Sequence, residues 1–179
     1  MDDQDVLTDI DTEKLEATAS AIRTLMGYHT YDLNILLVDD EAMQQTNLDS
    51  RGVDQPTDIL SFPFHEHITP GRLKEPEFDI PEYYNLGDIL IDVPYVMRVC
   101  EEDQQSGNSN EEPLAEDEEY DDRGVAASME AVKDPETRMH MLLVHGMLHL
   151  IGYDHETDED YEVMVSKEEE ILQKLNMKP

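Results

Sequence analysis

The 179-residue sequence has no tryptophan, only three phenylalanines and a single cysteine. A lone cysteine excludes an internal disulfide, and Cys100 stands among Val96, Met97 and Val99, where a small buried apolar residue is expected. No apolar run approaches the roughly 20 residues that cross a bilayer, and the acidic start lacks the basic and apolar parts of a signal peptide. We therefore expect a cytoplasmic protein without a membrane span, with Cys100 in its core.

Positive charge is also scarce, because 12 lysines and arginines face 44 acidic residues and the formal net charge is -32. Such a charge opposes attraction to phosphates at low salt. One hypothesis, motivated by this composition alone, is a host with high intracellular salt, where screening lengths shrink to about 3 Å at molar ionic strength. Equal folding at low and at molar potassium chloride, measured by circular dichroism, would refute it.

The length and the 39% hydrophobic content fit one domain, residues 1–179. Helical spacing and capping residues predict helices over 12–26, 39–48 and 95–104, a long one from Asp134, and a C-terminal one opened by Thr157. Strands are predicted over 33–38, 57–62 and 86–93, the first apolar on both faces as in a buried strand. Arg51 falls in a loop with Gly52 and Pro56.

An acidic segment interrupts this pattern. Residues 101–122 contain eleven acidic side chains and no lysine or arginine. They cannot bury enough apolar surface to order themselves, which predicts a mobile loop. Such a tract is usually a solvated face or tail rather than a specific binding element.

Three histidines near the C-terminus have the spacing of metal ligands. His145 and His149 are four residues apart on the predicted long helix, which places them one turn apart and roughly 40° apart around its axis. Gly152 can end the helix in a left-handed conformation, and the reversal would bring His155 to the same ion. Three protein nitrogens leave a fourth position open, which is typical of a catalytic zinc rather than a structural one.

An isolated histidine pair at this spacing more often belongs to the core or the surface. The full pattern His-x3-His-x2-Gly-x2-His, however, matches the zinc-binding half of the metzincin pattern. Peptidases of the His-Glu-x-x-His type carry their general base directly after the first histidine, and here that position is Gly146. The sequence thus predicts one Zn2+ per chain and favours a reaction such as phosphodiester cleavage over peptide hydrolysis.

Other polar and sulfur-bearing residues have weaker signals. His65 and His67 are minor candidates for lying near the site. Four acidic residues are candidates for supporting roles, and none of them is assigned as general base: Asp58, Asp88, Asp154 and Glu156. Four methionines are expected in the core: Met139, Met141, Met147 and Met164. His29 and His140 are expected to be ordinary polar residues.

The run from His145 to His155, including glycine at position 146, resembles the signature of the YbeY endoribonuclease family of rRNA maturation factors. Residues 48–52, 56–63 and 86–89 resemble the family's other blocks in the expected order. The resemblance covers roughly residues 10 to 175. It implies a single-domain α+β fold in which helices pack a mixed sheet of about four strands, with a zincin-like three-histidine metal site at the end of a long helix.

The resemblance also implies a function. Family members are zinc-dependent, single-strand-specific endoribonucleases that mature the 3′ end of small-subunit rRNA and take part in ribosome quality control. Implied partners are rRNA, the small ribosomal subunit, one of its proteins and an assembly GTPase. Arg51 matches a functionally important arginine of the family, which implies a catalytic role in binding phosphate or offsetting negative charge.

Three features depart from the family pattern: an acidic insertion at about 101–133, Asp92 where a small polar residue is more usual, and the extreme charge. Two rival functions also remain open. One is a metzincin-like metallopeptidase, against which Gly146 argues. The other is a non-catalytic ribosome-assembly factor in which zinc only fixes the long helix to the C-terminal segment.

Overall fold

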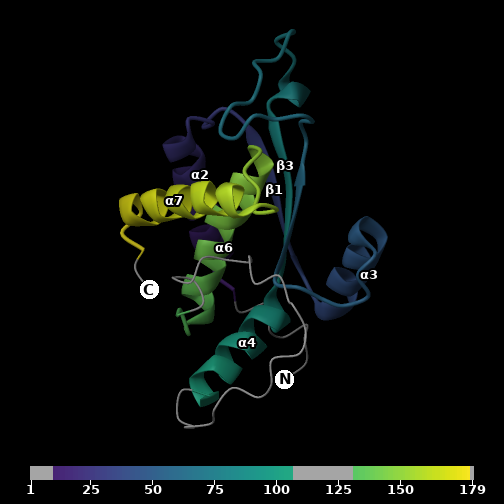
Figure 1. Cartoon of the computed structure of the whole chain (residues 1–179), viewed down its shortest axis with the longest axis vertical. Helices are drawn as coiled ribbons and strands as arrows, with labels where there is room; N and C mark the ends of the chain where they lie inside the picture. Colours follow the sequence, from purple (N-terminus) through teal and green to yellow (C-terminus); the bar gives the residue numbers. More distant parts are fainter. Residues whose placement is uncertain (1–9, 107–130, 178–179) are drawn as a thin grey trace.

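The computed structural model describes residues 10–106 and 131–177 (Figure 1). These residues form helices and strands packed into one α+β unit, as predicted. The helices are α2 (Thr12–Met26), α3 (Asp40–Arg51), α4 (Val93–Ser106), α6 (Pro135–Leu150) and α7 (Asp158–Lys174). The strands are β1 (Asp32–Val38), β2 (Ile59–Pro63) and β3 (Asn85–Asp92), and a short 3-10 turn, η1, covers Pro81–Tyr83.

The sheet has three strands among the described residues, so the expectation of about four is too high by one. Their order is β1-β3-β2, with β1 parallel to β3 and β2 antiparallel to it. The sheet is therefore mixed, as predicted. The long connection from β2 to β3 forms the excursion at the top of Figure 1.

The prediction that β1 is buried on both faces is wrong. β1 lies at the edge of the sheet, and its exposure alternates along the chain. Leu33, Ile35 and Leu37 pack against the core, whereas Leu36 is 44% exposed. The misleading signal is Leu36, an apolar residue on the face of β1 that is turned away from the core.

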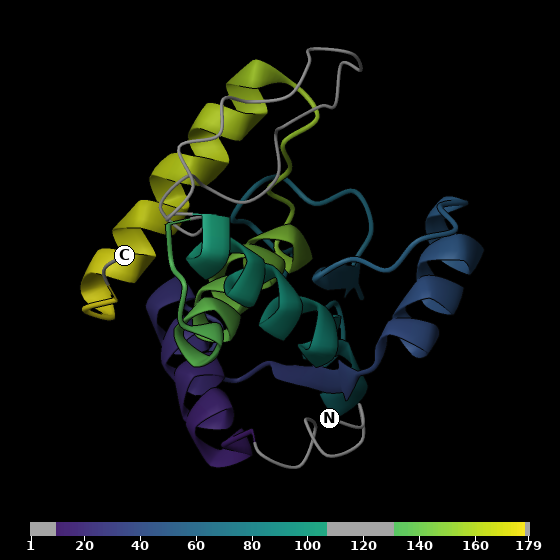
Figure 2. The ribbon, with the colours of Figure 1, turned by 90° about the horizontal axis from the view of Figure 1, so that it is seen from below.

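Helices lie on both sides of the sheet. Figures 1 and 2 place α2, α6 and α7 on one side and α3 on the other. The core on the α6 side includes Cys100 and the four methionines expected there, Met139, Met141, Met147 and Met164. In the part of the chain that the structure describes, no helix combines the length and hydrophobicity needed to span a bilayer.

Most helix ends follow the predicted capping residues. At the start of α6, the Asp134 side chain accepts a hydrogen bond from the Thr137 amide, and Pro135 occupies the first turn. At the start of α7, the Thr157 hydroxyl accepts a hydrogen bond from the Asp160 amide. α4 continues to Ser106, so residues 101–106, predicted to be part of a mobile loop, are helical. The rest of the acidic segment, 107–130, lies outside the described residues.

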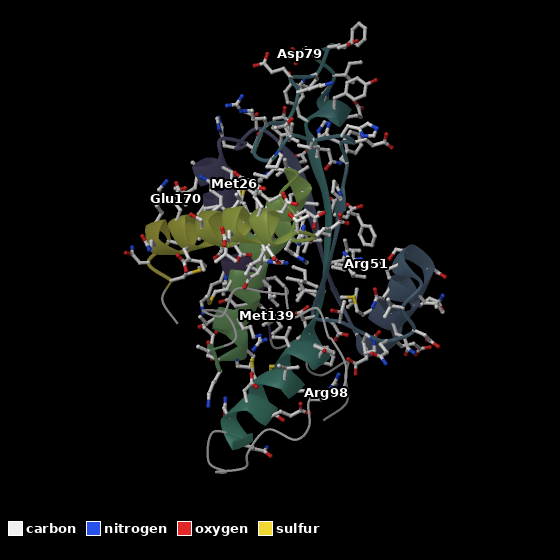
Figure 3. The ribbon with its side chains drawn as sticks, in the orientation of Figure 1. Met26, Arg51, Asp79, Arg98, Met139 and Glu170 are labelled. Atoms are coloured by element: carbon white, nitrogen blue, oxygen red, sulfur yellow. The ribbon has the colours of Figure 1, made fainter. Side chains whose placement is uncertain are left out.

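Arg51 is the last residue of α3, not a loop residue as predicted. α3 extends three residues beyond Leu48 because the chain leaves the helix only at Gly52, whose φ of 72° is left-handed. The helix thereby fixes the backbone of Arg51 beside the sheet, where Figure 3 labels its side chain.

Candidate metal centre

The end of α6 and the turn after it bring the three predicted histidines together. α6 ends at Leu150, and Gly152 follows with a φ of 89°, while the Tyr153 amide donates to the Leu148 carbonyl at 3.1 Å. A Cβ at Gly152 would also lie 2.8 Å from the Ile68 side chain. The predicted left-handed reversal at Gly152 is confirmed, and it returns His155 toward α6.

The three imidazoles face one another. The ring centroids of His145 and His149 are 4.7 Å apart, and His155 lies 5.6 Å and 5.0 Å from these two rings. One nitrogen of each ring lies within 4.8 Å of one nitrogen of the others. A single ion can therefore contact all three, which is the convergence that the sequence pattern predicts.

Hydrogen bonds fix the orientation of two of these rings. His145 Nδ1 lies 2.6 Å from Glu168 Oε1, and His149 Nδ1 lies 3.0 Å from the Tyr153 carbonyl oxygen. Both partners are acceptors, so each Nδ1 carries a proton and donates it. In each neutral ring Nε2 is then unprotonated and has a lone pair available for a metal ion. The two Nε2 atoms are 3.0 Å apart.

Both rings are neutral near pH 7. Burial lowers the pKa of His145 to about 4 and the pKa of His149 to about 3, with His155 adding repulsion in each case. Two neutral rings then point lone pairs at each other across 3.0 Å, which is unfavourable unless a cation lies between them. The donor set of imidazole nitrogens, already oriented by carboxylate and carbonyl, fits zinc.

Glu168 is the site residue that the sequence analysis missed. Its side chain is 1% exposed and reaches His145 from α7. A signal existed, because Glu168 falls on the apolar face of α7 together with the buried Met164, Ile171 and Leu172. A carboxylate at such a position must have a partner inside the fold.

Gly146 allows α6 to lie directly on the sheet. A Cβ at this position would meet Ile59 Cδ1 at 2.8 Å, Ser61 Oγ at 3.0 Å and Ile89 Cδ1 at 3.1 Å. The glutamate that His-Glu-x-x-His peptidases carry here would have to displace these side chains. Packing against β2 and β3 thus gives a physical reason for glycine and argues further against the peptidase alternative.

The three histidines lie in a cavity of about 840 Å3. Arg51 also lines it, and no ion pair or hydrogen bond engages the Arg51 side chain among the described residues. Of the supporting residues that the sequence suggested, several line the cavity: Asp58, His65, His67, Asp154 and Glu156. Asp88 does not, since it accepts a hydrogen bond from Asn34 and lines a separate groove beside α2.

Two of the lining carboxylates are engaged by the backbone. Asp58 Oδ1 accepts from the Ile59 amide at 2.8 Å, and Asp154 Oδ1 accepts from the His155 amide at 2.8 Å. These bonds fix the start of β2 and the turn that carries His155. His29 and His140 do not line the cavity, as expected for ordinary polar residues.

Fold and site together define a single-domain α+β protein with a three-histidine group that can hold a metal ion beside an arginine. Comparison with known proteins gives the family. The model of the family described as Endoribonuclease YbeY matches residues 2–115 and 122–176. The chain therefore belongs to this family.

Curated relatives named Endoribonuclease YbeY match most of the chain. The human protein is 32% identical over 90% of this chain and 78% of its own length, and the Acetivibrio thermocellus protein is 32% identical over 94% and 91%. The Halalkalibacterium halodurans protein is 35% identical over 80% and 71%. A solution structure of a Thermotoga maritima protein aligns over 92% of this chain and 83% of its own, with 22% identity and a TM-score of 0.44.

Proposed function

We propose that this protein is a zinc-dependent, single-strand-specific endoribonuclease that matures the 3′ end of small-subunit rRNA and takes part in ribosome quality control. Membership of the Endoribonuclease YbeY family supports the reaction class. The observation that carries the proposal is the meeting of His145, His149 and His155 with Arg51 in one cavity. A metal site beside a free guanidinium suits a phosphodiester.

In this proposal the three histidines hold the ion, and their own contacts preset the geometry. Glu168 and the Tyr153 carbonyl orient two rings, so that little reorganisation accompanies binding. Zinc in such a site supplies Lewis acidity and an acidified water at neutral pH. Arg51 binds the scissile phosphate and offsets the negative charge that develops on it.

Proton transfer is left to the other groups that line the cavity. His65 and His67 reach it from the connection between β2 and β3, and Glu156 reaches it from the turn before α7. Imidazole and carboxylate side chains are the usual general acids and bases. No single one of them is assigned this role.

The proposed partners follow from the substrate: rRNA within the small ribosomal subunit, one protein of that subunit, and an assembly GTPase. The proposed location is the cytoplasm, where such subunits are built. That the acidic segment at about 101–133 is an insertion relative to the family stays a prediction. The family model leaves residues 116–121 within this segment unmatched.

Cleavage of single-stranded rRNA fragments tests the proposal. The wild type with zinc should cut them, whereas His149→Ala and Arg51→Ala should each lose at least about 100-fold in rate, as expected for groups that stabilise transition-state charge. Arg98→Ala is the matched control, because Arg98 pairs with Asp40 and does not line the cavity. The assay should span a range of salt, since phosphate contacts weaken as salt rises.

Two outcomes would contradict the proposal. Equal cleavage by all four proteins would indicate a contaminating nuclease. If the wild type never cuts RNA and zinc removal only melts the protein, the ion is structural, and the non-catalytic assembly factor is the better description.

A further inference from the structure

Most of the lysine and arginine side chains that the structure describes are engaged by contacts within the fold. Ion pairs or hydrogen bonds engage the basic side chains of seven described residues, namely Lys14, Arg23, Arg98, Lys133, Arg138, Lys167 and Lys174. Three other described cations have no such contact with the described residues: Arg51, Arg72 and Lys74. In a chain with 44 acidic residues, three cations without an ion pair or hydrogen bond to the described residues are candidates for binding an anionic ligand.

One of the three, Arg51, lines the histidine cavity. The other two lie on the connection between β2 and β3, whose earlier residues His65, His67 and Ile68 form a wall of the same cavity. All three cations thus lie on segments of the chain that border this cavity.

The segment that bears Arg72 is fixed against the cavity rim. The Gly71 amide donates to the Ile151 carbonyl at 2.9 Å, directly after α6, and the Tyr28 hydroxyl donates to the Gly71 carbonyl at 3.0 Å. Gly71 packs so closely on Tyr153, a residue of the cavity wall, that a Cβ would lie 2.9 Å from its hydroxyl oxygen. Arg72 begins one residue, about 3.8 Å, beyond this contact.

Exposure alternates along the next residues. Arg72 and Lys74 are exposed, whereas Leu73 between them packs against the core, and its amide donates to the Tyr28 hydroxyl at 3.1 Å. Both cationic side chains are therefore open to solvent, whereas the Leu73 side chain is turned to the core. The backbone is held by hydrogen bonds, while both charged groups stay available to a ligand.

We propose that Arg72 and Lys74 form a second phosphate-binding point, which holds the backbone of a single RNA strand where it passes over the rim of the histidine cavity. This inference rests on the proposed function. Arg51 contacts the scissile phosphate, and Arg72 and Lys74 contact phosphates further along the same strand. Binding at two separated points gives this acidic protein its affinity for RNA without a broad basic surface.

The test compares Arg72→Ala/Lys74→Ala with Lys167→Ala/Lys174→Ala. Both double variants remove two positive charges, but Lys167 and Lys174 are both paired with Glu170 on α7. Cleavage kinetics use oligouridylates of 3 to 15 nucleotides, and binding is measured in the His149→Ala background, where the strand stays intact. Neither replaced pair has a side-chain contact that holds the cavity together, so folding should be unaffected.

For long oligouridylates the Arg72/Lys74 variant should raise KM and leave kcat unchanged. The slope of log binding constant against log salt concentration should become shallower by about 1.4, at roughly 0.7 per lost phosphate contact on a single strand. The variant's loss of affinity relative to wild type should therefore grow about 25-fold as salt falls from 1 M to 0.1 M. For three nucleotides bound at the Arg51 point alone, the variant should match wild type. The Lys167/Lys174 control should match wild type at every length.

Failure of the inference can be told from failure of the proposed function. If the wild type cuts RNA and both double variants have the same KM and salt dependence as the wild type, the second phosphate-binding point is refuted and the proposed endoribonuclease function stands. If RNA binds with the full Arg72/Lys74 dependence but is never cut, the proposed function is refuted and the binding point remains. If no oligouridylate binds at any salt, both are refuted.

Discussion

Replacing Glu168 with alanine should weaken zinc binding without removing a ligand. The carboxylate lies 2.6 Å from His145 Nδ1, and both side chains are almost fully buried, 1% and 7% exposed. Without it, His145 Nδ1 has no acceptor in place, and the ring is free to turn its lone pair away from His149. Loss of such a supporting contact typically lowers metal affinity by about 10- to 100-fold, which corresponds to roughly 1.4 to 2.7 kcal/mol.

A competition titration against a zinc chelator would measure this loss. Glu168→Gln keeps an oxygen that can accept from Nδ1 and should recover most of the affinity, which separates orientation of the ring from simple packing. Glu169→Ala is the matched control, because Glu169 is the adjacent residue on α7 and is exposed. A Glu168→Ala variant that is folded and binds zinc within twofold of wild type would refute the reasoning.

Three further predictions follow from packing, burial and charge. Gly146→Ala should destabilise the protein by about 1 kcal/mol or more in urea unfolding, because the new Cβ crowds Ile59, Ser61 and Ile89; stabilisation, as helix propensity alone would give, would show that the contact is relaxed. Burial raises the pKa of Asp92 to about 7, so the folded state holds this proton more tightly than the unfolded chain and loses stability as the pH rises from about 4 to 7. Asp92→Asn keeps an acceptor for the Tyr95 amide and should add about 2 to 4 kcal/mol of unfolding free energy at pH 8, with the gain shrinking toward pH 5; a gain independent of pH would contradict this cause. Chelation of zinc should abolish RNA cleavage and addition of zinc should restore it, and cleavage that is indifferent to the chelator would exclude the ion from the reaction.

The histidine site was readable from the sequence because local geometry determines most of it. The four-residue spacing of His145 and His149 places both side chains on the same face of a helix, one turn apart. The left-handed conformation of Gly152 then sets the direction of the chain that follows. The capping residues Asp134 and Thr157 likewise act within one turn, and both lie where they were expected.

The missed features depend on which elements pack together. Glu168 belongs to the site only because α7 crosses α6, and no local pattern states that crossing. The apolar residues of β1 predict a buried strand. The strand order β1-β3-β2, which the sequence of β1 does not determine, places this strand at the edge of the sheet. Arg51 was expected in a loop because Gly52 and Pro56 follow it, whereas the helix continues until the left-handed glycine itself.

Anomalous diffraction at the zinc edge, on crystals grown with zinc, tests the central claim most directly. The account predicts one strong peak about 2.0 to 2.1 Å from a nitrogen of His145, of His149 and of His155, with the remaining coordination place filled by a non-protein ligand. A peak bound by four protein atoms, or no peak among these rings, would contradict it.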